Sequence, residues 1–311
     1  MRRREKMIKV FLLRSSIRLD NELVIERDNK MMDGKNNEWI KPNETPFFLR
    51  CTSVKYAEPF LEKGSIKFGS PRTWEQDAFE SKIIGRGDPY EGTIAFANSF
   101  DVDKILELSN KYPDTERLKY MNRTLFKRTR SMDLPCFCMY DLKMEQFTKP
   151  LKEGWQIVNA KIPAGYFADF VEHKTKEEIE ILPVEDRPAL IAINKPGEFR
   201  NRINKYLISI GCKESEILIS LVTYVDFEKY GENGWYDFAQ KEPKELFLKS
   251  SIFSRHNEVR IVVNTDNKDV LDKLKGPIEI GNLSDIAFVS EHFYDEGVVV
   301  EMKVDAYIID E

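Results

Sequence analysis

The segment PFFLRCTSVKYAEPFLEKGSIKFGSPRTWEQ (46–76) carries the local pattern that decides the fold class. Its beginning, PFFLRCTS (46–53), reads as a strand with three buried apolar residues. Thr52 or Ser53 can cap a short helix, VKYAEPFLEK, which ends at the following Gly64. SIKFGS is expected to form a second short strand. A strand, a helix and another strand therefore follow one another closely.

Strand-like patterns dominate the rest of the chain. They are found at 8–28, LPCFCMYDL (134–142), WQIVNAKIP (155–163), PALIAIN (188–194), EILISLVTYVDF (216–227), NEVRIVVN (257–264), GPIEIG (276–281), SDIAFVS (284–290) and GVVVEMKVDAYIID (297–310). Helical periodicity appears at 101–112, 114–130 and 164–173, and in FRNRINKYLISIG and KDVLDKLKG. Because strands outnumber helices and do not alternate strictly with them, we predict an α+β fold. Its core would be a mostly antiparallel, mixed sheet with peripheral helices.

The composition is that of a globular protein. Of 311 residues, 41% are hydrophobic and 32% charged, with a formal net charge of −5, which argues against disorder and against a non-specific nucleic-acid binder. The simplest organisation is one domain over residues 1–311. Its core would span 46–264, with N-terminal strands and a loop at 1–45 and C-terminal strands at 265–311.

The cysteines and the N-terminus favour a cytoplasmic protein. Cys51, Cys136, Cys138 and Cys212 are too few and too scattered for a disulfide framework. The apolar run after the basic N-terminus, at 10–13, is too short for a signal peptide. No segment approaches the roughly 18 apolar residues of a membrane-spanning helix. Reduced thiols and no membrane contact are expected.

The stretch from Arg50 to Glu91 is the first candidate site. Small residues at strand ends, such as Ser70, let a ligand approach the backbone, and Trp74 offers a flat stacking surface. Arg50 could hold a phosphate through paired hydrogen bonds. The alternative is that Arg50 forms an ordinary ion pair and that Trp74 belongs to the core.

The second candidate lies in NEVRIVVN (257–264). Side chains alternate between the two faces of a strand, so Glu258 and Arg260 share a face at the start of an otherwise apolar strand. A buried charge is costly unless it is paired. The carboxylate is therefore either paired with an arginine for structure or used for chemistry, and the pattern leaves both open.

A third candidate is the basic end of the helix expected at 114–130. It carries Arg123, Lys127 and Arg128, which could contact the phosphates of a nucleic acid or of another acceptor. A solvated helix face is the plainer interpretation. A non-catalytic nucleotide- or nucleic-acid-binding module would use these cations.

Metal chemistry has weaker support. Asp77, Glu80, Asp88 and Glu91 lie close in sequence and could hold Mg²⁺ in a nuclease-like site, but no lysine-bearing strand motif accompanies them. The chain has no Walker-type glycine loop, no GxGxxG, no HExxH and no GxSxG. No metal is therefore expected.

Four pieces in order carry a family resemblance: FLRCTS…LEKGSIKFGSPRTWEQ, DPYEGT, LPCFCMYDL and VTYVDF…LFLKSSIFSRHNEVRIVV. Together they resemble a bacterial family of uncharacterised proteins, domain of unknown function twenty-nine seventy-one, over roughly residues 46–264. The family's closing lysine and Glu-x-Arg strand correspond to Lys249, Glu258 and Arg260. Cys138 replaces the usual serine.

That layout is similar to a divergent ADP-ribosyltransferase. The resemblance implies an NAD-consuming enzyme, either an ADP-ribosyltransferase or an NAD glycohydrolase, with NAD as substrate and a protein or nucleic acid as acceptor. A toxin or an anti-phage defence effector is the setting it implies. Glu258 would be the catalytic residue and Arg50, Ser70, Trp74 and Arg260 would bind the nucleotide.

Overall fold

The computed structural model describes residues 7–19, 22–28, 44–81, 87–151, 154–168, 170, 174–227, 243–290 and 298–309. The chain divides into two compact units. Unit 1 comprises Met1–Lys63, Asp141–Arg200 and Asn282–Glu311, and unit 2 comprises Gly64–Tyr140 and Asn201–Gly281. Most of the loop expected before residue 46, the Gly-rich part of the 82–91 loop and the end of the helix expected at 164–173 lie outside the described residues. The expectation of one domain stays a prediction.

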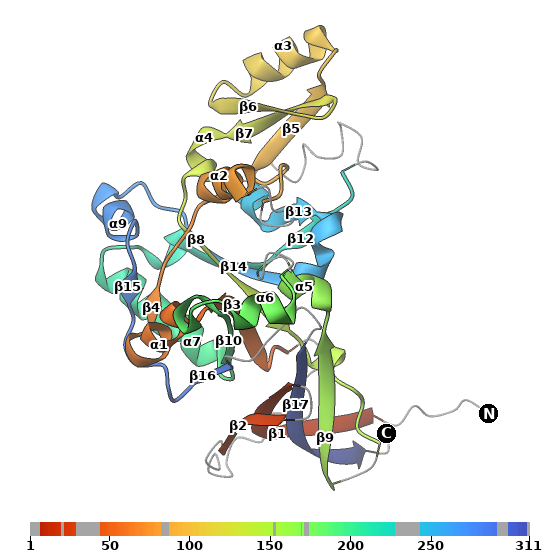
Figure 1. The fold of residues 1–311 in the computed structure, drawn as a ribbon. Coiled ribbons are helices and arrows are strands. Elements are labelled where there is room, and N and C mark those ends of the chain that lie inside the picture. Colours follow the sequence, from red (N-terminus) through yellow and green to blue (C-terminus); the bar gives the residue numbers. More distant parts are fainter. Residues whose placement is uncertain are drawn as a thin grey trace, which may run out of the picture. The chain divides into compact units, whose positions relative to one another are not determined.

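Both units combine helices with mostly antiparallel sheets, which confirms the predicted class at that level. One sheet of unit 1 has the strand order β2-β1-β17-β9 (Figure 1). The strands are β1 (Met7–Leu19), β2 (Glu22–Asp28), β9 (Gly154–Ile162) and β17 (Val298–Ile309), all paired antiparallel. In β9, Val158, Ala160 and Ile162 are buried while their neighbours are exposed, so one face of the strand packs inward.

Unit 1 contains three further antiparallel strands in the order β3-β10-β16. They are β3 (Phe47–Ser53), β10 (Pro188–Ile193) and β16 (Ala287–Ser290). Every residue of β10 is buried, as in a strand that is covered on both faces. The helical elements of this part are α1 (Val54–Lys63), η1 (Met144–Gln146), α5 (Ala164–Ala168), α6 (Lys176–Glu180), η2 (Val184–Asp186) and α7 (Pro196–Ser209), which continues into unit 2.

Unit 2 is built around three antiparallel strands in the order β11-β14-β8. These are β11 (Ile217–Leu221), β14 (Glu258–Val263) and β8 (Cys136–Leu142). β14 therefore has a hydrogen-bonded neighbour on each side. Short pairs join β12 (Thr223–Val225) to β13 (Leu248–Ser250) in parallel and β4 (Ser65–Ile66) to β15 (Ile278–Glu279) antiparallel.

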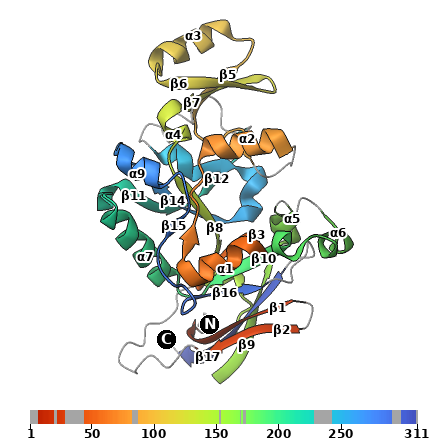
Figure 2. The same ribbon diagram turned by 60° about the vertical axis from the view of Figure 1, so that its left-hand side comes forward.

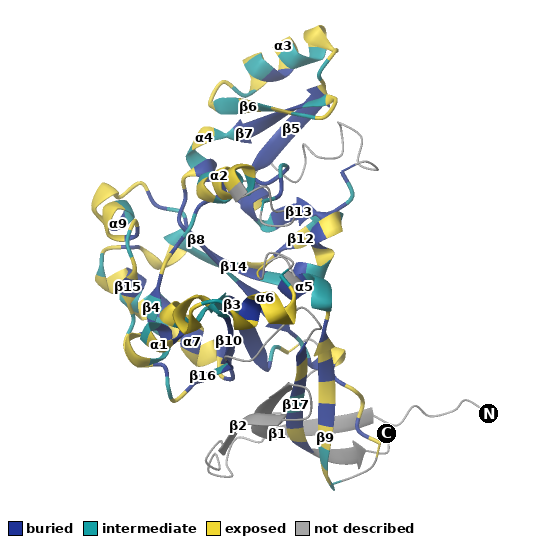
Figure 3. Ribbon diagram, viewed as in Figure 1, coloured by how far each residue is buried: buried dark blue, intermediate teal, exposed yellow. Residues whose placement is uncertain are grey.

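A smaller antiparallel sheet of unit 2 has the order β5-β7-β6, with helix α3 (Val102–Lys111) lying along it (Figure 2). Its strands are β5 (Thr93–Asn98), β6 (Thr115–Tyr120) and β7 (Arg123–Arg128). Figure 3 shows β5 and β7 as mostly buried, whereas much of α3 is exposed. Other helical segments of unit 2 are α2 (Pro71–Ser81), α4 (Thr129–Met132), η3 (Glu214–Glu216), η4 (Lys244–Phe247), η5 (Ser251–His256) and α9 (Lys268–Lys273).

The helix predicted for 114–130 is wrong, because this segment forms the β6–β7 hairpin. Leu125 and Phe126 point to different faces of β7, and both are buried because each face is covered: Leu125 packs in a cluster with Tyr90 and Phe227, and Phe126 in a cluster with Leu108 of α3. Tertiary burial on two faces thus overrides the helical spacing of the apolar residues. Met121 adopts a positive φ of 52° in the turn, a conformation that a helix does not use.

The sequence interpretation also missed α2 and β5. The strand expected over SIKFGS is limited to Ser65–Ile66, and Pro71 begins α2, where its fixed φ and missing N–H cost little. Ser70 precedes the helix, and its hydroxyl accepts a hydrogen bond from the Thr73 N–H at 3.3 Å, which is the bond of an N-cap residue. In the described part of the chain, no helix has the length and apolar character needed to cross a membrane.

Candidate functional site

The candidate site lies in unit 2 and starts from the alternation of β14. Glu258 and Arg260 share a face of this strand, as predicted, and Arg260 Nη2 lies 2.9 Å from Glu258 Oε2. Arg260 is completely buried, with Trp74, Glu91 and the Leu246 carbonyl oxygen packed around its guanidinium group. The two charges therefore meet where water does not screen them.

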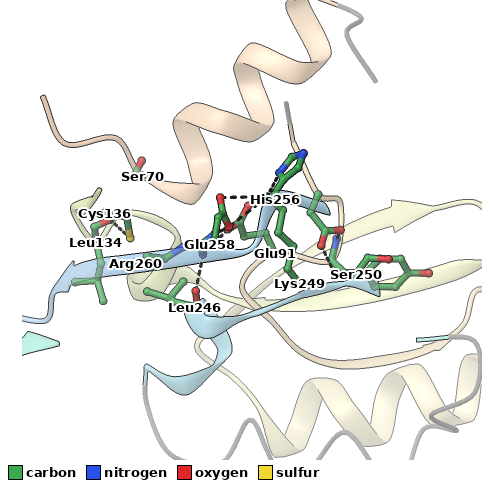
Figure 4. A network of polar contacts seen from close by, with 12 residues as sticks. Ser70, Glu91, Leu134, Cys136, Leu246, Lys249, Ser250, His256, Glu258 and Arg260 are labelled. Atoms are coloured by element: carbon green, nitrogen blue, oxygen red, sulfur yellow. Dashed lines mark hydrogen bonds and ion pairs between the residues drawn. The ribbon is translucent and has the colours of Figure 1, made fainter. Parts of the chain in front are cut away.

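Arg260 is surrounded by groups that compensate its charge. Nη1 contacts Glu91 Oε1 and donates a hydrogen bond to the carbonyl oxygen of Leu246 (Figure 4). The Trp74 ring centroid lies 5.1 Å from the guanidinium carbon, within the range of a cation–π contact. Burial acts to lower the pKa of Arg260, but neighbouring anionic groups raise it well above its ordinary value. Arg260 is therefore a permanent buried cation shared by two carboxylates.

Glu258 is held from its other side by Lys249. Lys249 Nζ lies 3.4 Å from each carboxylate oxygen of Glu258. Burial acts to raise the pKa of Glu258, but Lys249 and Arg260 lower it more strongly, to about 2. The carboxylate is thus ionised at neutral pH. Among the described residues, Oε2 receives a hydrogen bond from Arg260, while Oε1 has only the long contact to Lys249.

Lys249 also joins His256 to the cluster. Its Nζ lies 3.3 Å from His256 Nδ1 and 5.0 Å from the Phe253 ring centroid. Burial acts to lower the pKa of Lys249, and Glu258 then raises it above its ordinary value, so the amine is charged. An ammonium group has donors only, so we assign Nδ1 as the acceptor and place the imidazole proton on Nε2.

The DPYE turn supplies two buried carboxylates. Asp88 Oδ1 accepts the Tyr90 N–H at 2.9 Å, and Oδ2 accepts the Ser250 N–H. Burial raises the pKa of Asp88 to about 6, with Glu91 adding to the rise, although the two N–H donors oppose it. Glu91 reaches Arg260 from the same turn. The turn is therefore attached both to the segment that carries Lys249 and to β14.

Tyr224 contacts the start of β14. The Glu258 N–H donates a hydrogen bond to Tyr224 Oη at 2.8 Å. Burial raises the pKa of Tyr224 above its ordinary value, with the charge of Glu258 acting in the same direction. The phenol is therefore neutral and available as a hydrogen-bond donor beside Glu258.

The structure brings Trp74 and Glu258 to the same arginine, whereas Ser70 has a local structural contact. Gly69 pairs with Cys136 of β8 through two backbone hydrogen bonds, of 2.9 and 2.8 Å. A Cβ atom at Gly69 would lie 2.5 Å from Trp74 Nε1, so the glycine lets the indole lie against the backbone. Ser70 caps α2 through Thr73. The ligand roles predicted for Ser70, Trp74 and Arg260 stay predictions.

Arg50 belongs to unit 1. It lies in β3, paired opposite Ile191 of β10, and it is half-buried. The other candidates lie in unit 2. The nucleotide-binding role predicted for Arg50 stays a prediction.

The three basic residues predicted to contact an acceptor have partners inside unit 2. Arg123 Nη1 contacts the Tyr90 hydroxyl and the Phe227 carbonyl oxygen at 3.1 and 3.2 Å. Lys127 is buried and lies 3.3 Å from Glu75 Oε1. Arg128 Nη1 lies 3.1 Å from Glu245 Oε1. They lie on a central strand rather than on a solvated helix face, and their contact role stays a prediction.

The four carboxylates considered for Mg²⁺ have different surroundings. Asp77 and Glu80 are exposed on α2, where Glu80 accepts a hydrogen bond from Gln76, whereas Asp88 and Glu91 are buried in the DPYE turn. The described residues contain no group of three or more His, Cys, Asp or Glu side chains placed to bind a metal ion.

Sequence reasoning missed His256 and Tyr224 as members of the cluster and used Lys249 only within the resemblance. Tyr224 lies on a separate strand, β12, and carries no spacing signal relative to Glu258. His256 lies two residues before Glu258 but in the turn η5, so strand alternation does not place it. The roles of Asp88 and Glu91 were likewise undefined by sequence. Searches against known families, curated proteins and solved structures gave no match to this chain.

Proposed function

We propose that unit 2 is the catalytic part of an NAD-consuming enzyme, an ADP-ribosyltransferase or an NAD glycohydrolase, with Glu258 as its catalytic carboxylate. The observation that carries the proposal is the state of Glu258. Its carboxylate is ionised and held by Arg260 and Lys249, and among the described residues its Oε1 has only the long contact to Lys249. An ADP-ribosyltransferase-like arrangement of the strands is part of this proposal.

This charge suits cleavage of the bond between nicotinamide and ribose. As that carbon–nitrogen bond breaks, its electron pair neutralises the pyridinium ring, and positive charge develops on the ribose. A fixed carboxylate stabilises that charge, and because it is already oriented, no reorganisation is needed during the reaction. Oε1 of Glu258 would accept a hydrogen bond from a ribose hydroxyl. Water or an acceptor nucleophile then adds to the ribose carbon and loses its proton.

The pyrophosphate of NAD needs cations other than the two beside Glu258. Arg260 is already paired with Glu91 and Glu258, and Lys249 is paired with Glu258. Paired buried cations are poor phosphate ligands, because rearranging them leaves carboxylates uncompensated. Within the proposal, Arg260 therefore orients Glu258 and does not bind the pyrophosphate.

The test is incubation of the full chain with NAD, followed by assay of free nicotinamide and of label transferred to protein, DNA or RNA. Glu258→Gln keeps the size of the side chain and removes its charge, so we expect turnover to fall by about 100-fold or more. Circular dichroism checks that this variant folds, and Glu258→Asp serves as a second variant. Glu116→Gln is the control, because Glu116 contributes to a surface pair with Arg72.

Two outcomes contradict the proposal. One is a wild-type protein that releases no nicotinamide and transfers no label, and the other is full turnover by folded Glu258→Gln. Binding of NAD without any product would instead support the non-catalytic nucleotide-binding alternative. A toxin or defence role predicts growth arrest on expression that Glu258→Gln abolishes.

A further inference from the structure

The DPYE turn is fixed tightly enough to place one carboxylate. The Glu91 N–H donates to the Asp88 carbonyl oxygen at 2.9 Å, and the Tyr90 ring stacks on Phe227 with centroids 4.2 Å apart. Gly92 follows with a φ of 72°, and a Cβ atom there would lie 2.6 Å from a sulfur of the adjacent core. The backbone at Glu91 is therefore held on both sides.

Glu91 and Glu258 share one guanidinium group. Glu91 occupies Nη1 of Arg260, together with the Leu246 carbonyl oxygen, and Glu258 occupies Nη2 (Figure 4). These contacts at Nη1 fix the orientation of the guanidinium group, and Nη2 of the group held in this way donates to Glu258 Oε2. Hydrogen bonds between an arginine and a carboxylate depend on the plane of the guanidinium, so its orientation determines how Glu258 is held.

We infer that Glu91 is a positioning residue that fixes the guanidinium group of Arg260 and, through it, the carboxylate of Glu258. Asp88 supports it, because its carboxylate fixes the same turn to the backbone of Ser250. The inference rests on the proposed function only where it gives the Glu258 carboxylate a catalytic use. The position of the Glu258 carboxylate can be measured whether or not the protein turns over NAD.

A second arginine shared by two carboxylates lies at the surface of the protein. Arg72 is shared by Glu116, at 3.0 Å from Nη1, and Asp133, at 2.6 Å from Nε. Glu116→Gln therefore removes one of two carboxylates from a shared arginine, as Glu91→Gln does. It does so away from Glu258, which makes it the control for a general effect of the substitution.

The experiment measures the side-chain carboxyl signal of Glu258 by NMR in the full chain labelled with [δ-¹³C]glutamate, with the signal assigned by its loss in Glu258→Gln. In Glu91→Gln we expect this signal to move, because the guanidinium loses one of its two carboxylate partners and shifts toward Glu258. Glu91→Asp retains the charge but shortens the reach, so we expect a smaller change in the same direction. Glu116→Gln should leave the signal in place.

An unchanged Glu258 signal in Glu91→Gln overturns the inference, and if that variant does not fold, an unchanged signal in Glu91→Asp does so. Where NAD is turned over, Glu91→Gln should lower kcat by about 10-fold or more with KM changed less than about twofold, because it alters a group that acts on the transition state. Glu91→Asp should restore part of kcat. A moved signal in a protein without NAD turnover supports the positioning role and refutes the proposed function.

Discussion

Replacing Arg260 by methionine would leave two buried carboxylates without their shared cation. In the folded protein the Arg260 side chain is 0% exposed, and those of Glu91 and Glu258 are 6% and 13% exposed. Removing one partner of a buried ion pair costs about 3–5 kcal/mol, because the remaining charge is uncompensated. Glu258 keeps Lys249, whereas Glu91 has no second ion pair among the described residues. We therefore expect Arg260→Met to lose about 3–5 kcal/mol of unfolding free energy, most of it through Glu91.

The assay is urea denaturation of the full chain at pH 7, with Arg72→Met as the control. Arg72 is also shared by two carboxylates, but its side chain is 40% exposed, and those of Glu116 and Asp133 are 32% and 58% exposed. Exposed pairs contribute about 0–1 kcal/mol, because water and salt screen them. The two arginine variants should therefore differ by about 2 kcal/mol or more.

In Arg260→Met, the cost of leaving two carboxylates uncompensated can be distinguished from the loss of their attraction to the arginine. If the cost comes from uncompensated buried carboxylates, adding Glu91→Gln and Glu258→Gln to Arg260→Met should recover at least half of the lost stability, because both carboxylates are then absent. Lowering the pH toward 4 should also reduce the cost, since the stranded carboxylates become protonated. Equal losses for Arg260→Met and Arg72→Met, or no recovery in the triple variant, would refute this reasoning.

Two further predictions concern the surroundings of the cluster. Gly69→Ala would place a Cβ atom 2.5 Å from Trp74 Nε1, so we expect a loss of about 1–3 kcal/mol of unfolding free energy in urea denaturation. The control is Gly197→Ala, which has nothing within 4 Å of its Cβ and should stay within about 0.5 kcal/mol of the wild type. An unchanged stability of Gly69→Ala would contradict the packing argument. The pKa of Asp88 is raised from 3.8 to about 6. Between these pH values the folded state therefore binds more protons than the unfolded state. The contribution of Asp88 to stability is complete below pH 4 and is lost as the pH rises through 6. Relative to Asp88→Asn, the wild type should therefore lose up to about 3 kcal/mol between pH 4 and 7, and a relative gain would refute the assigned direction.

Elements whose apolar residues repeat with a clear period were predictable from the sequence, and elements that are buried on two faces were not. The alternation in NEVRIVVN predicted both β14 and the shared face of Glu258 and Arg260. The 114–130 segment was misassigned because its apolar residues fit a helical spacing, while the burial of Leu125 and Phe126 on opposite faces depends on the segments packed against each face. A pattern in one segment cannot report what other segments place against it.

By itself, the sequence determined the mixed, mostly antiparallel class, the strand that carries Glu258 and Arg260, and the need to pair a charge on a buried strand. Only the tertiary structure decided that Glu91 and Trp74 meet Arg260, and that Lys249 holds Glu258 from the other side. The reason is that strand alternation is local, with a period of two residues. The partners of a buried charge come from segments as far apart as residues 74, 91 and 249, and folding alone brings them together.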